Sequence, residues 1–214
     1  MFKTILLIGN GKLSKSLQPL LSDYQVHVFD ETNINELQNH LGDLLIDCSL
    51  PSSFNHIYKY LCTHLIPAII CSTGHDKKEL TLLKELSNKI PIFQSENFSL
   101  GINLLNRFIK NSSSYLSLYD CHILDIHHKD KKDSPSGTSI KLSETLTNVN
   151  YLSIRSNNCL GQHEIYFISN DEEIKLSHKS ISKEVYAKGI LLAIKYIKNK
   201  RSGYFTMEDL IDEI

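Results

Sequence analysis

The sequence predicts an α/β fold in which a parallel sheet covered by helices is joined to a second unit of α+β type. Short apolar runs alternate with helix-like segments through the first half of the chain, which is typical of parallel strands joined by crossover helices. From about residue 99 the alternation gives way to a helical segment and several strand-like runs. With 214 residues, 41% of them hydrophobic, the chain can build one large core or two smaller ones.

The elements of the first half follow from the apolar runs. Strands are expected at 4–8, 26–29, 44–48, 67–71 and 90–93. Helices are expected between them at 12–22, 33–41, 53–62 and 76–88. Pro67 and Pro91 fall at the starts of strands, where a missing N–H is tolerated.

The second half is expected to form its own sheet, with antiparallel strands. The pattern predicts helices at 101–110 and 137–147, and strand-like runs at 118–127, 150–155, 163–169 and 173–179. A long helix at about 184–198 and an amphipathic segment at 207–211 close the chain.

Charge and cysteine content limit the class of partner and the compartment. The 23 basic and 24 acidic residues leave a net charge of −1, so no global field favours nucleic acid or an anionic membrane. Small-molecule partners are therefore expected. Five cysteines without a Cys-x-x-Cys pair indicate reduced thiols in the cytoplasm. The apolar run at 5–8 is too short for a signal peptide, and no run approaches the roughly 18 residues that span a membrane.

A glycine-containing turn follows the first predicted strand. Gly9, Gly11 and Ser14 form a Gly-x-Gly-x-x-Ser turn that opens a helix, as in loops that hold a pyrophosphate. A purely structural strand–turn–helix fits this turn equally well. Asp30 ends the second strand, where a dinucleotide-binding fold places the carboxylate that binds the adenosine ribose. Asp30 is followed by Glu31, and no lysine or arginine stands beside it to neutralise the 2′-phosphate of NADPH. NADH should therefore be accepted at least as well as NADPH, although Lys12 in the loop could meet a phosphate.

The densest polar segment runs from residue 125 to 138, between a strand and a helix. His127 and Lys131 suit protonation of a substrate and stabilisation of its charge. Ser136 can cap the following helix, so the N–H groups of Gly137 and Thr138 are expected to face an incoming anion. A solvated, charged surface turn is the alternative interpretation.

A metal site at this segment is disfavoured, although His127, His128, Asp130 and Asp133 include suitable ligands. Adjacent histidines on a strand point to opposite faces, which makes joint ligation awkward. We therefore expect no metal.

The 125–138 segment resembles a motif of the dihydrodipicolinate reductase family, Glu-x-His-His-x-x-Lys-x-Asp-Ala-Pro-Ser-Gly-Thr. Asp125 stands for the glutamate and Ser134 for the alanine. Further blocks are similar to the family at 46–51, 71–74, 96–103, 161–163, 187–189 and 202–209, together with Arg155 and His178. The resemblance covers nearly the whole chain.

The resemblance implies an enzyme that uses NADH or NADPH to reduce 4-hydroxy-tetrahydrodipicolinate, with loss of water, in lysine and diaminopimelate biosynthesis. It implies His127 as the proton donor and Lys131 as its catalytic partner. Binding of the substrate carboxylates falls to His128, Ser136, Gly137 and Thr138. Binding of the cofactor falls to Gly9, Gly11, Lys12, Leu13, Asp30, Ser72, Thr73, Gly74, Asn97 and Phe98.

The resemblance also implies a Rossmann-like dinucleotide-binding domain, 1–98 plus 184–214, with an inserted substrate-binding domain, 99–183, whose sheet builds a homotetramer. Three positions depart from the family pattern: Ser14 in a shortened phosphate loop, Cys71 in place of glycine, and Lys183 in place of arginine. A non-catalytic NAD(P)-binding regulator of the same fold, or a dehydrogenase of another small dicarboxylate, are the alternatives.

Overall fold

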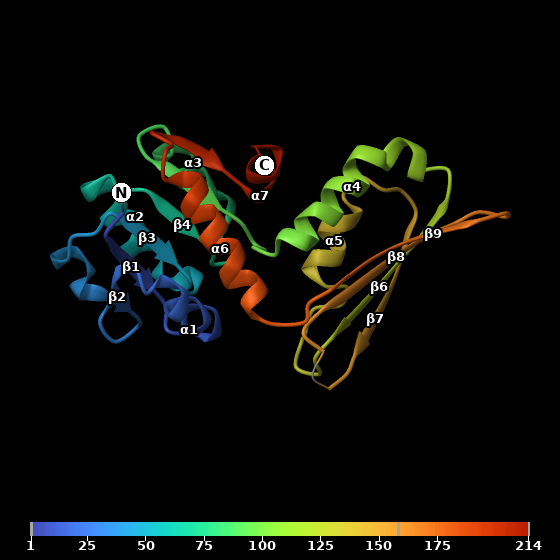
Figure 1. Ribbon diagram of the computed structural model, residues 1–214, viewed down its shortest axis with the longest axis horizontal. Coiled ribbons are helices and arrows are strands. Elements are labelled where there is room, and N and C mark those ends of the chain that lie inside the picture. Colours follow the sequence, from blue (N-terminus) through green and yellow to red (C-terminus); the bar gives the residue numbers. More distant parts are fainter. Residues whose placement is uncertain (1, 158, 214) are drawn as a thin grey trace. The chain divides into compact units, whose positions relative to one another are not determined.

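The computed structural model describes residues 2–157 and 159–213. The chain divides into two compact units (Figure 1). The first unit comprises Met1–Ser99 and Glu184–Ile214, and the second comprises Leu100–Lys183.

The first unit is built on a six-stranded sheet in the order β10-β5-β4-β3-β1-β2. Its strands are β1 (Thr4–Ile8), β2 (Gln25–Phe29), β3 (Leu44–Asp47), β4 (Ala68–Ile70), β5 (Pro91–Gln94) and β10 (Gly203–Phe205). Every pairing is parallel, as predicted. The chain moves outward from β1 in both directions, so the carboxyl ends of β1 and β3 flank a topological switch point, where such sheets bind ligands.

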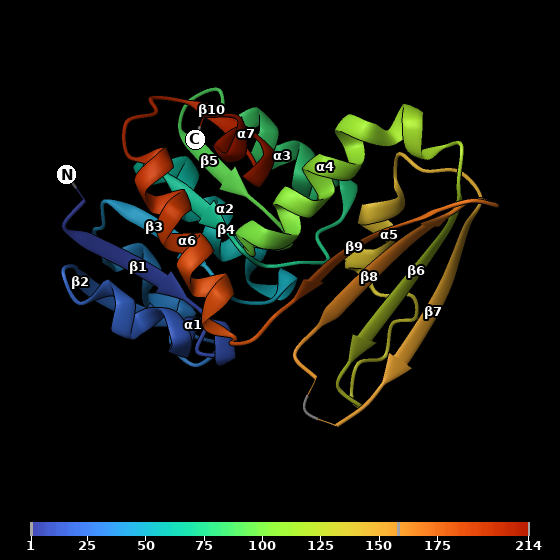
Figure 2. The same cartoon turned by 45° about the vertical axis from the view of Figure 1, so that its right-hand side comes forward.

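Helices cover this sheet and bury its apolar side chains. They are α1 (Lys12–Leu17), α2 (Phe54–His64), α3 (Lys77–Leu86), α6 (Glu184–Ile197) and α7 (Met207–Glu213), with 3₁₀ turns at Gln18–Leu21, Ile34–Asn39 and Pro51–Ser53. Helix α6 contacts α1 and strands β4 and β5 (Figure 2). The strands β1, β3 and β4 are almost wholly buried, which explains their continuous apolar sequences.

Two predicted helices of the first unit are shorter than expected. The helix predicted at 33–41 is a 3₁₀ helix, Ile34–Asn39. Its buried side chains are Ile34 and Leu37, and this three-residue spacing matches a 3₁₀ turn. The helix predicted at 12–22 ends at Leu17 and continues as a 3₁₀ turn with Pro19 in its first turn.

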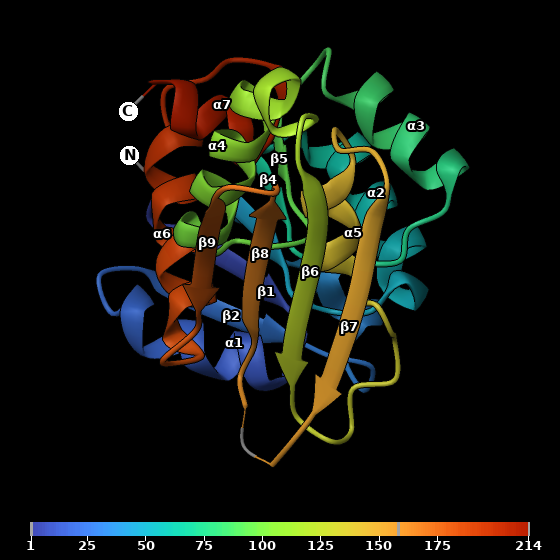
Figure 3. The same ribbon diagram turned by 90° about the vertical axis from the view of Figure 1, so that its right-hand side faces the viewer.

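The second unit holds a four-stranded sheet in the order β7-β6-β8-β9 (Figure 3). Its strands are β6 (Asp120–His127), β7 (Val149–Arg155), β8 (Gln162–Ile168) and β9 (Glu173–Lys179). The prediction of an antiparallel sheet was wrong, because β6 and β7 are parallel while the other two pairings are antiparallel. Helix α5 (Gly137–Ser143) lies between β6 and β7 in sequence and supplies the crossover that a parallel pair requires.

One face of this sheet packs on helices α4 (Leu100–Leu116) and α5. The core between them contains Ile109, Ile123, Leu142, Ile165 and Phe167, all nearly inaccessible to solvent. Odd-numbered residues of β6 are buried and most even-numbered ones are more exposed, as the two-residue period of a strand requires. Among the described residues, no helix is both long and apolar enough to cross a membrane.

Candidate active site

A row of polar side chains crosses the sheet of the second unit. The register aligns Asp125 of β6 with Ser153 of β7 on one side and with His163 of β8 on the other. His163 is aligned in turn with His178 of β9. Residues in register share a face of the sheet, so strand pairing brings these groups together from positions far apart in the sequence.

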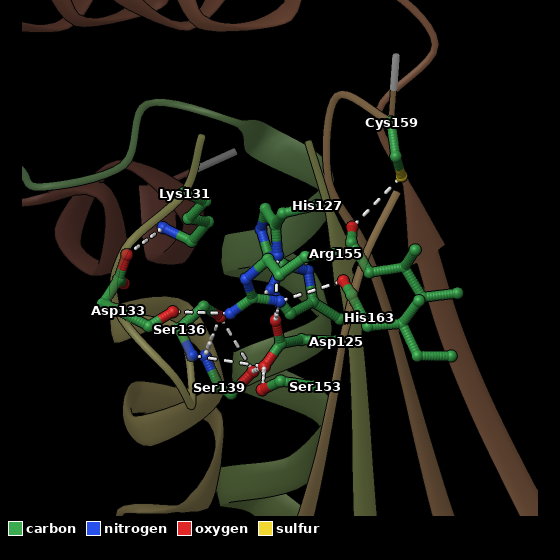
Figure 4. Close-up of polar contacts among 12 residues, drawn as sticks. Asp125, His127, Lys131, Asp133, Ser136, Ser139, Ser153, Arg155, Cys159 and His163 are labelled. Carbon is green, nitrogen blue, oxygen red and sulfur yellow. Dashed lines mark hydrogen bonds and ion pairs between the residues drawn. The ribbon is translucent and has the colours of Figure 1, made fainter. Parts of the chain in front are cut away.

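Asp125 is the centre of this cluster, with only 1% of its surface exposed. It accepts hydrogen bonds from His127 Nδ1 (2.9 Å), Arg155 Nη1 (2.7 Å), Ser153 Oγ (2.7 Å), Ser136 N (3.2 Å) and Ser139 Oγ (3.3 Å) (Figure 4). Burial raises the pKa of Asp125, but these hydrogen bonds, led by that of Ser153, outweigh it and lower the pKa to about 2. The carboxylate is therefore ionised at neutral pH.

The ionised Asp125 selects one tautomer of His127. A carboxylate only accepts hydrogen bonds, so His127 Nδ1 must carry the hydrogen and Nε2 is left for a ligand. Gly161 borders that atom, since a Cβ on Gly161 would lie 3.4 Å from His127 Nε2. Burial, together with the charges of Lys131 and Arg155, lowers the pKa of His127 against the opposing effect of Asp125. The ring is accordingly neutral at pH 7, and an anionic ligand beside it would favour its protonation.

His163 supports the start of helix α5. Its Nε2 lies 3.2 Å from Ser136 Oγ, which also accepts a hydrogen bond from Ser139 N (3.1 Å) as the helix N-cap. Burial, followed by the charge of His127, lowers the pKa of His163 to about 3. Its Nδ1 is buried and has no hydrogen-bond partner in the described part of the chain.

Lys131 and the start of α5 are held by one carboxylate, that of Asp133. Lys131 Nζ lies 2.9 Å from Asp133 Oδ1, and Gly137 N donates to Asp133 Oδ2 (3.1 Å). Arg155 Nη2 donates to the backbone carbonyl of Asp133 (2.5 Å). The Gly137 N–H, which was predicted to face an incoming anion, is bonded to the Asp133 carboxylate four residues away, so an anion that used this donor would replace that acceptor.

The remaining predicted substrate residues differ in exposure. His128 follows the end of β6, and its side chain is 52% exposed. Ser136 is buried, whereas Thr138 is partly exposed in the first turn of α5. His127 turns inward to Asp125, and among the described residues no group of three or more histidine, cysteine or acidic side chains is arranged to hold a metal ion.

The phosphate-loop residues lie at the switch point of the first unit. Gly9 has φ +101°, and a Cβ there would lie 2.5 Å from the carbonyl oxygen of Cys48, so only glycine fits. A Cβ on Gly11 would meet nothing within 4 Å, so space is open beside the loop. Ser14 is buried and its hydroxyl accepts from Gln18 Nε2 (3.3 Å), which accommodates a serine where the glycine pattern ends. Lys12 is exposed and Leu13 is half-buried.

Asp30 stands at the end of β2 beside this loop. Asp30 Oδ1 accepts from Thr32 N (3.0 Å) and Thr32 Oγ1 (2.6 Å), and Asp30 Oδ2 lies 3.4 Å from Asn10 Nδ2. These bonds, led by that of the Thr32 hydroxyl, lower the pKa of Asp30. An open glycine loop and an ionised acceptor at the end of the second strand fit the adenosine half of a dinucleotide.

The residues expected near the nicotinamide follow β4 and β5. Ser72 is buried, Thr73 is exposed, and Gly74 has φ +85°. Asn97 Oδ1 accepts from Ser99 N (2.9 Å). The ring of Phe98 is 2% exposed and lies 5.8 Å from that of Phe93, so this side chain belongs to the core.

Sequence patterns alone did not reveal the roles of Asp125, Ser139, Ser153 and His163. Arg155 and His163 stood in blocks similar to the family, without a role. The available signal was a polar residue at a buried position of a strand, as at Asp125, which follows Cys121 and Ile123 on the buried face of β6. Such a residue is costly to bury unless it is bonded, so it marks a site.

Comparison with known proteins agrees with this arrangement. Residues 9–98 match the family model described as dihydrodipicolinate reductase, N-terminus, and residues 101–211 match that for the C-terminus. A relative in Thermosipho africanus, named 4-hydroxy-tetrahydrodipicolinate reductase, is 33% identical over 207 residues, covering 95% of this chain and 94% of the relative. A protein of the same name in Clostridium tetani is 34% identical, covering 97% and 96% of the two chains.

A solved structure shares the fold of both units. It is described as dipicolinate-bound dihydrodipicolinate reductase from Paenisporosarcina sp. TG-14, with a TM-score of 0.78 and 18% identity. The match covers 96% of this chain and 98% of that one. From the two family models and the full-length relatives, this chain belongs to the dihydrodipicolinate reductase family.

Proposed function

We propose that this chain catalyses the NAD(P)H-dependent reduction of 4-hydroxy-tetrahydrodipicolinate to tetrahydrodipicolinate, with loss of water, in lysine and diaminopimelate biosynthesis. The observation that carries the proposal is the Asp125–His127 pair, which leaves His127 Nε2 directed to a ligand beside the cations Lys131 and Arg155. The full-length relatives bear the name of this activity. Neither the comparisons nor the site supports a non-catalytic regulator.

His127 supplies the proton in this proposal. Burial, and after it the charges of Lys131 and Arg155, lower the pKa of His127. The substrate is a dianion, and its carboxylates offset those charges. Protonation at Nε2 then gives an imidazolium whose Nδ1–H remains bonded to Asp125. When bound, the nicotinamide supplies the hydride, and His127 Nε2 gives its proton to the carbon skeleton of the substrate.

Lys131 binds a substrate carboxylate, which replaces Asp133 as its ion-pair partner. In the structure Asp133 accepts bonds from Lys131 Nζ and Gly137 N. A substrate carboxylate that takes over these donors converts them into a cradle completed by Ser136, Thr138 and His128. Dipicolinate bound to the Paenisporosarcina protein is a planar dicarboxylate, which supports a small dicarboxylate as the ligand here.

NADH is the proposed preferred cofactor. The Asp30 carboxylate is ionised and partly exposed, and no lysine or arginine pairs with it in the described residues. A 2′-phosphate would meet this negative charge without compensation. Gly9, Gly11, Lys12 and Leu13 hold the pyrophosphate, and Ser72–Gly74 with Asn97 and the backbone of Phe98 flank the nicotinamide.

A homotetramer and a cytoplasmic location complete the proposal. The second face of the β7-β6-β8-β9 sheet has no helix of the second unit over it (Figure 3) and carries Leu124, Ile126, Leu152 and Ile154. The apolar β6 and β7 part of this face suits association with other copies, while Glu164 and Lys175 lie on its β8 and β9 part. All five cysteines are free thiols, which agrees with a reducing compartment.

Competition tests the substrate class. Pyridine-2,6-dicarboxylate should inhibit substrate-dependent oxidation of NADH competitively with 4-hydroxy-tetrahydrodipicolinate. Lys131→Ala should weaken this inhibition, whereas the neighbouring Lys132→Ala should not. Inhibition that is unaffected by Lys131→Ala would place the dicarboxylate elsewhere.

A further inference from the structure

A chain of four polar side chains runs through the first unit, apart from the groups already assigned to the phosphate loop. It starts at Asp47, at the end of β3, where Ser72 Oγ contacts Asp47 Oδ2. Ser72 Oγ lies 2.7 Å from His75 Nε2, and His75 Nδ1 lies 2.9 Å from Glu79 Oε2. The chain therefore connects the end of one strand, the turn after the next strand, and the first turn of α3.

The chain is buried over most of its length. Asp47 is 1% exposed, Ser72 is 3% exposed, and the side chain of His75 is 2% exposed. Only Glu79, with 22% of its side chain exposed, reaches solvent. Bonds left unmade in such a place are costly, so hydrogens must be distributed along the whole chain.

The three contacts need one hydrogen more than two carboxylates, one hydroxyl group and a neutral imidazole supply. Three hydrogen bonds connect the four residues, and each needs one hydrogen. With both carboxylates ionised and a neutral imidazole, only two hydrogens are available, one on the Ser72 hydroxyl and one on the ring. The third bond forms only if a further proton is bound.

Geometry leaves the proton to the inner part of the chain. Glu79 is the more exposed acid, and its carboxylate also accepts a hydrogen bond from Asp76 N (3.2 Å), so it is the acceptor at the outer end of the chain. Burial raises the pKa of Asp47, which favours a proton on that carboxyl group. Whether the proton sits on Asp47 or on the imidazole, His75 Nδ1 carries a hydrogen that it donates to Glu79.

Among the described residues, the only other charged side chain bonded to these four residues is that of Asp76, whose Oδ1 accepts from Glu79 N (2.8 Å). On the α2 side His75 meets the ring of Phe54, at 5.5 Å between centroids. Beside Asp47, burial raises the pKa of the Cys71 thiol, which therefore stays neutral. Ser49 N and Ser49 Oγ donate to the other oxygen of Asp47 at 2.9 and 2.5 Å.

The connectivity Glu79–His75–Ser72 is that of a nucleophilic triad, but its surroundings exclude this role. Ser72 Oγ is bonded to Asp47 as well as to His75 and is almost inaccessible. An acyl substrate could not reach it. The chain instead fixes the turn that begins at Ser72.

We propose that Asp47, Ser72, His75 and Glu79 form a proton-holding hydrogen-bond chain that fixes the turn at residues 72–74 for cofactor binding, with His75 as a positioning residue. This inference rests on the proposed function, which gives that turn to the nicotinamide. Loss of the proton breaks one bond of the chain, so affinity for NADH should decrease as pH rises through its titration.

Glu79→Gln is the sharpest test because it adds a hydrogen-bond donor at the end of the chain and keeps all four side chains in it. The amide donates to His75 Nδ1, His75 Nε2–H donates to Ser72, and Ser72 donates to Asp47, so all three bonds form with no extra proton. Nitrogen NMR of the ligand-free protein should show His75 Nδ1 protonated in the wild type and bare in Glu79→Gln. Glu85→Gln, on the same helix, is the control and should keep the wild-type tautomer.

Binding titrations with NADH over a range of pH supply the functional readout. In the wild type the dissociation constant of NADH should rise once the pH exceeds the value at which the hydrogen-bond chain loses its proton. The rise should be at most about tenfold per pH unit, because binding is linked to one proton. Glu79→Gln should remove this dependence, and His75→Ala should raise the dissociation constant roughly tenfold below the titration. An unchanged tautomer in Glu79→Gln would overturn the inference even if NADH binds. If the His75 tautomer switches in Glu79→Gln but the wild type does not bind NADH, both the role of the chain in cofactor binding and the proposed function are overturned.

Discussion

At the scale of single residues, Asp125 controls the site through the tautomer that it imposes on His127. Asparagine at position 125 can donate its amide to His127 Nδ1, which moves the ring hydrogen to Nε2 and removes the charge that stabilises an imidazolium. We expect Asp125→Asn to lower kcat by about 100-fold or more, with little change in the dissociation constant of NADH. Steady-state kinetics and NADH titration check this, and a kcat within a few-fold of the wild type would contradict the assigned role.

Gly161 limits the space in front of His127 Nε2, the proposed proton donor. Its backbone angle φ is +140°, which residues other than glycine rarely adopt. A Cβ added at this position would lie 3.4 Å from His127 Nε2. Gly161→Ala should therefore destabilise the protein by about 1 to 3 kcal/mol and also raise the KM for substrate. Urea unfolding measures the change in stability, and steady-state kinetics measure the change in KM. A variant equal to the wild type in both would show that the close approach of residue 161 to His127 matters neither for stability nor for substrate binding.

The residue scale also shows what the sequence could predict about the site. His127 and Lys131 could be proposed from their motif, because the chemistry of a histidine and a lysine is evident from the residue type. The roles of Ser153 and His163 were not, since they depend on a strand register that joins positions 28 and 38 residues from Asp125. The bond between Gly137 N and Asp133 also escaped prediction, because a loop conformation decides which acceptor takes a free N–H.

At the scale of elements, strand β8 carries a buried histidine that makes the second unit sensitive to acid. His163 has its pKa lowered from 6.5 to about 3 by burial, so it is neutral in the native state while an unfolded chain binds a proton below about pH 6.5. Stability contributed by the neutral ring is present above that pH and is lost as the pH falls towards 3. Over this interval the loss is roughly 3 to 5 kcal/mol.

His163→Gln should reduce this acid sensitivity. Chemical denaturation at several pH values should show a shallower fall in the free energy of unfolding between about pH 6 and 4 than in the wild type. His122→Gln, at an exposed position of β6, is the matched control and should keep the wild-type slope. Equal slopes in all three proteins would mean that His163 is protonated in the native state.

Prediction of the elements succeeded where periodicity was strong and failed where pairing decides the outcome. The parallel sheet of the first unit was predicted because its strands are continuous apolar runs separated by helices. The mixed sheet of the second unit was not predicted. The short helix between β6 and β7 makes these two strands parallel, and the direction of a strand leaves no trace in its sequence pattern. Strand β10 was missed because three residues, Gly203–Phe205, give no recognisable period.

At the scale of the whole molecule, the proposed homotetramer depends on the open face of the second sheet. Leu152 and Ile154 are 61% and 41% exposed on β7. Replacing both by lysine would place charges in an apolar interface, so light scattering of the double variant should give a smaller mass than the wild type. The single exposed substitution Leu41→Lys, in the first unit, should leave the mass unchanged. A wild-type mass of one chain would exclude the tetramer.

Turnover of the wild type and of His127→Ala tests most directly whether this chain is a reductase whose proton donor is His127. Each protein is mixed with NADH and 4-hydroxy-tetrahydrodipicolinate, formed in place from aspartate semialdehyde and pyruvate by its synthase, and the loss of reduced-nicotinamide absorbance is followed. We predict rapid, substrate-dependent loss for the wild type and a rate lower by about 100- to 10,000-fold for His127→Ala, with equal dissociation constants for NADH. No loss with the folded wild-type protein, or equal rates in the two proteins, would contradict the account.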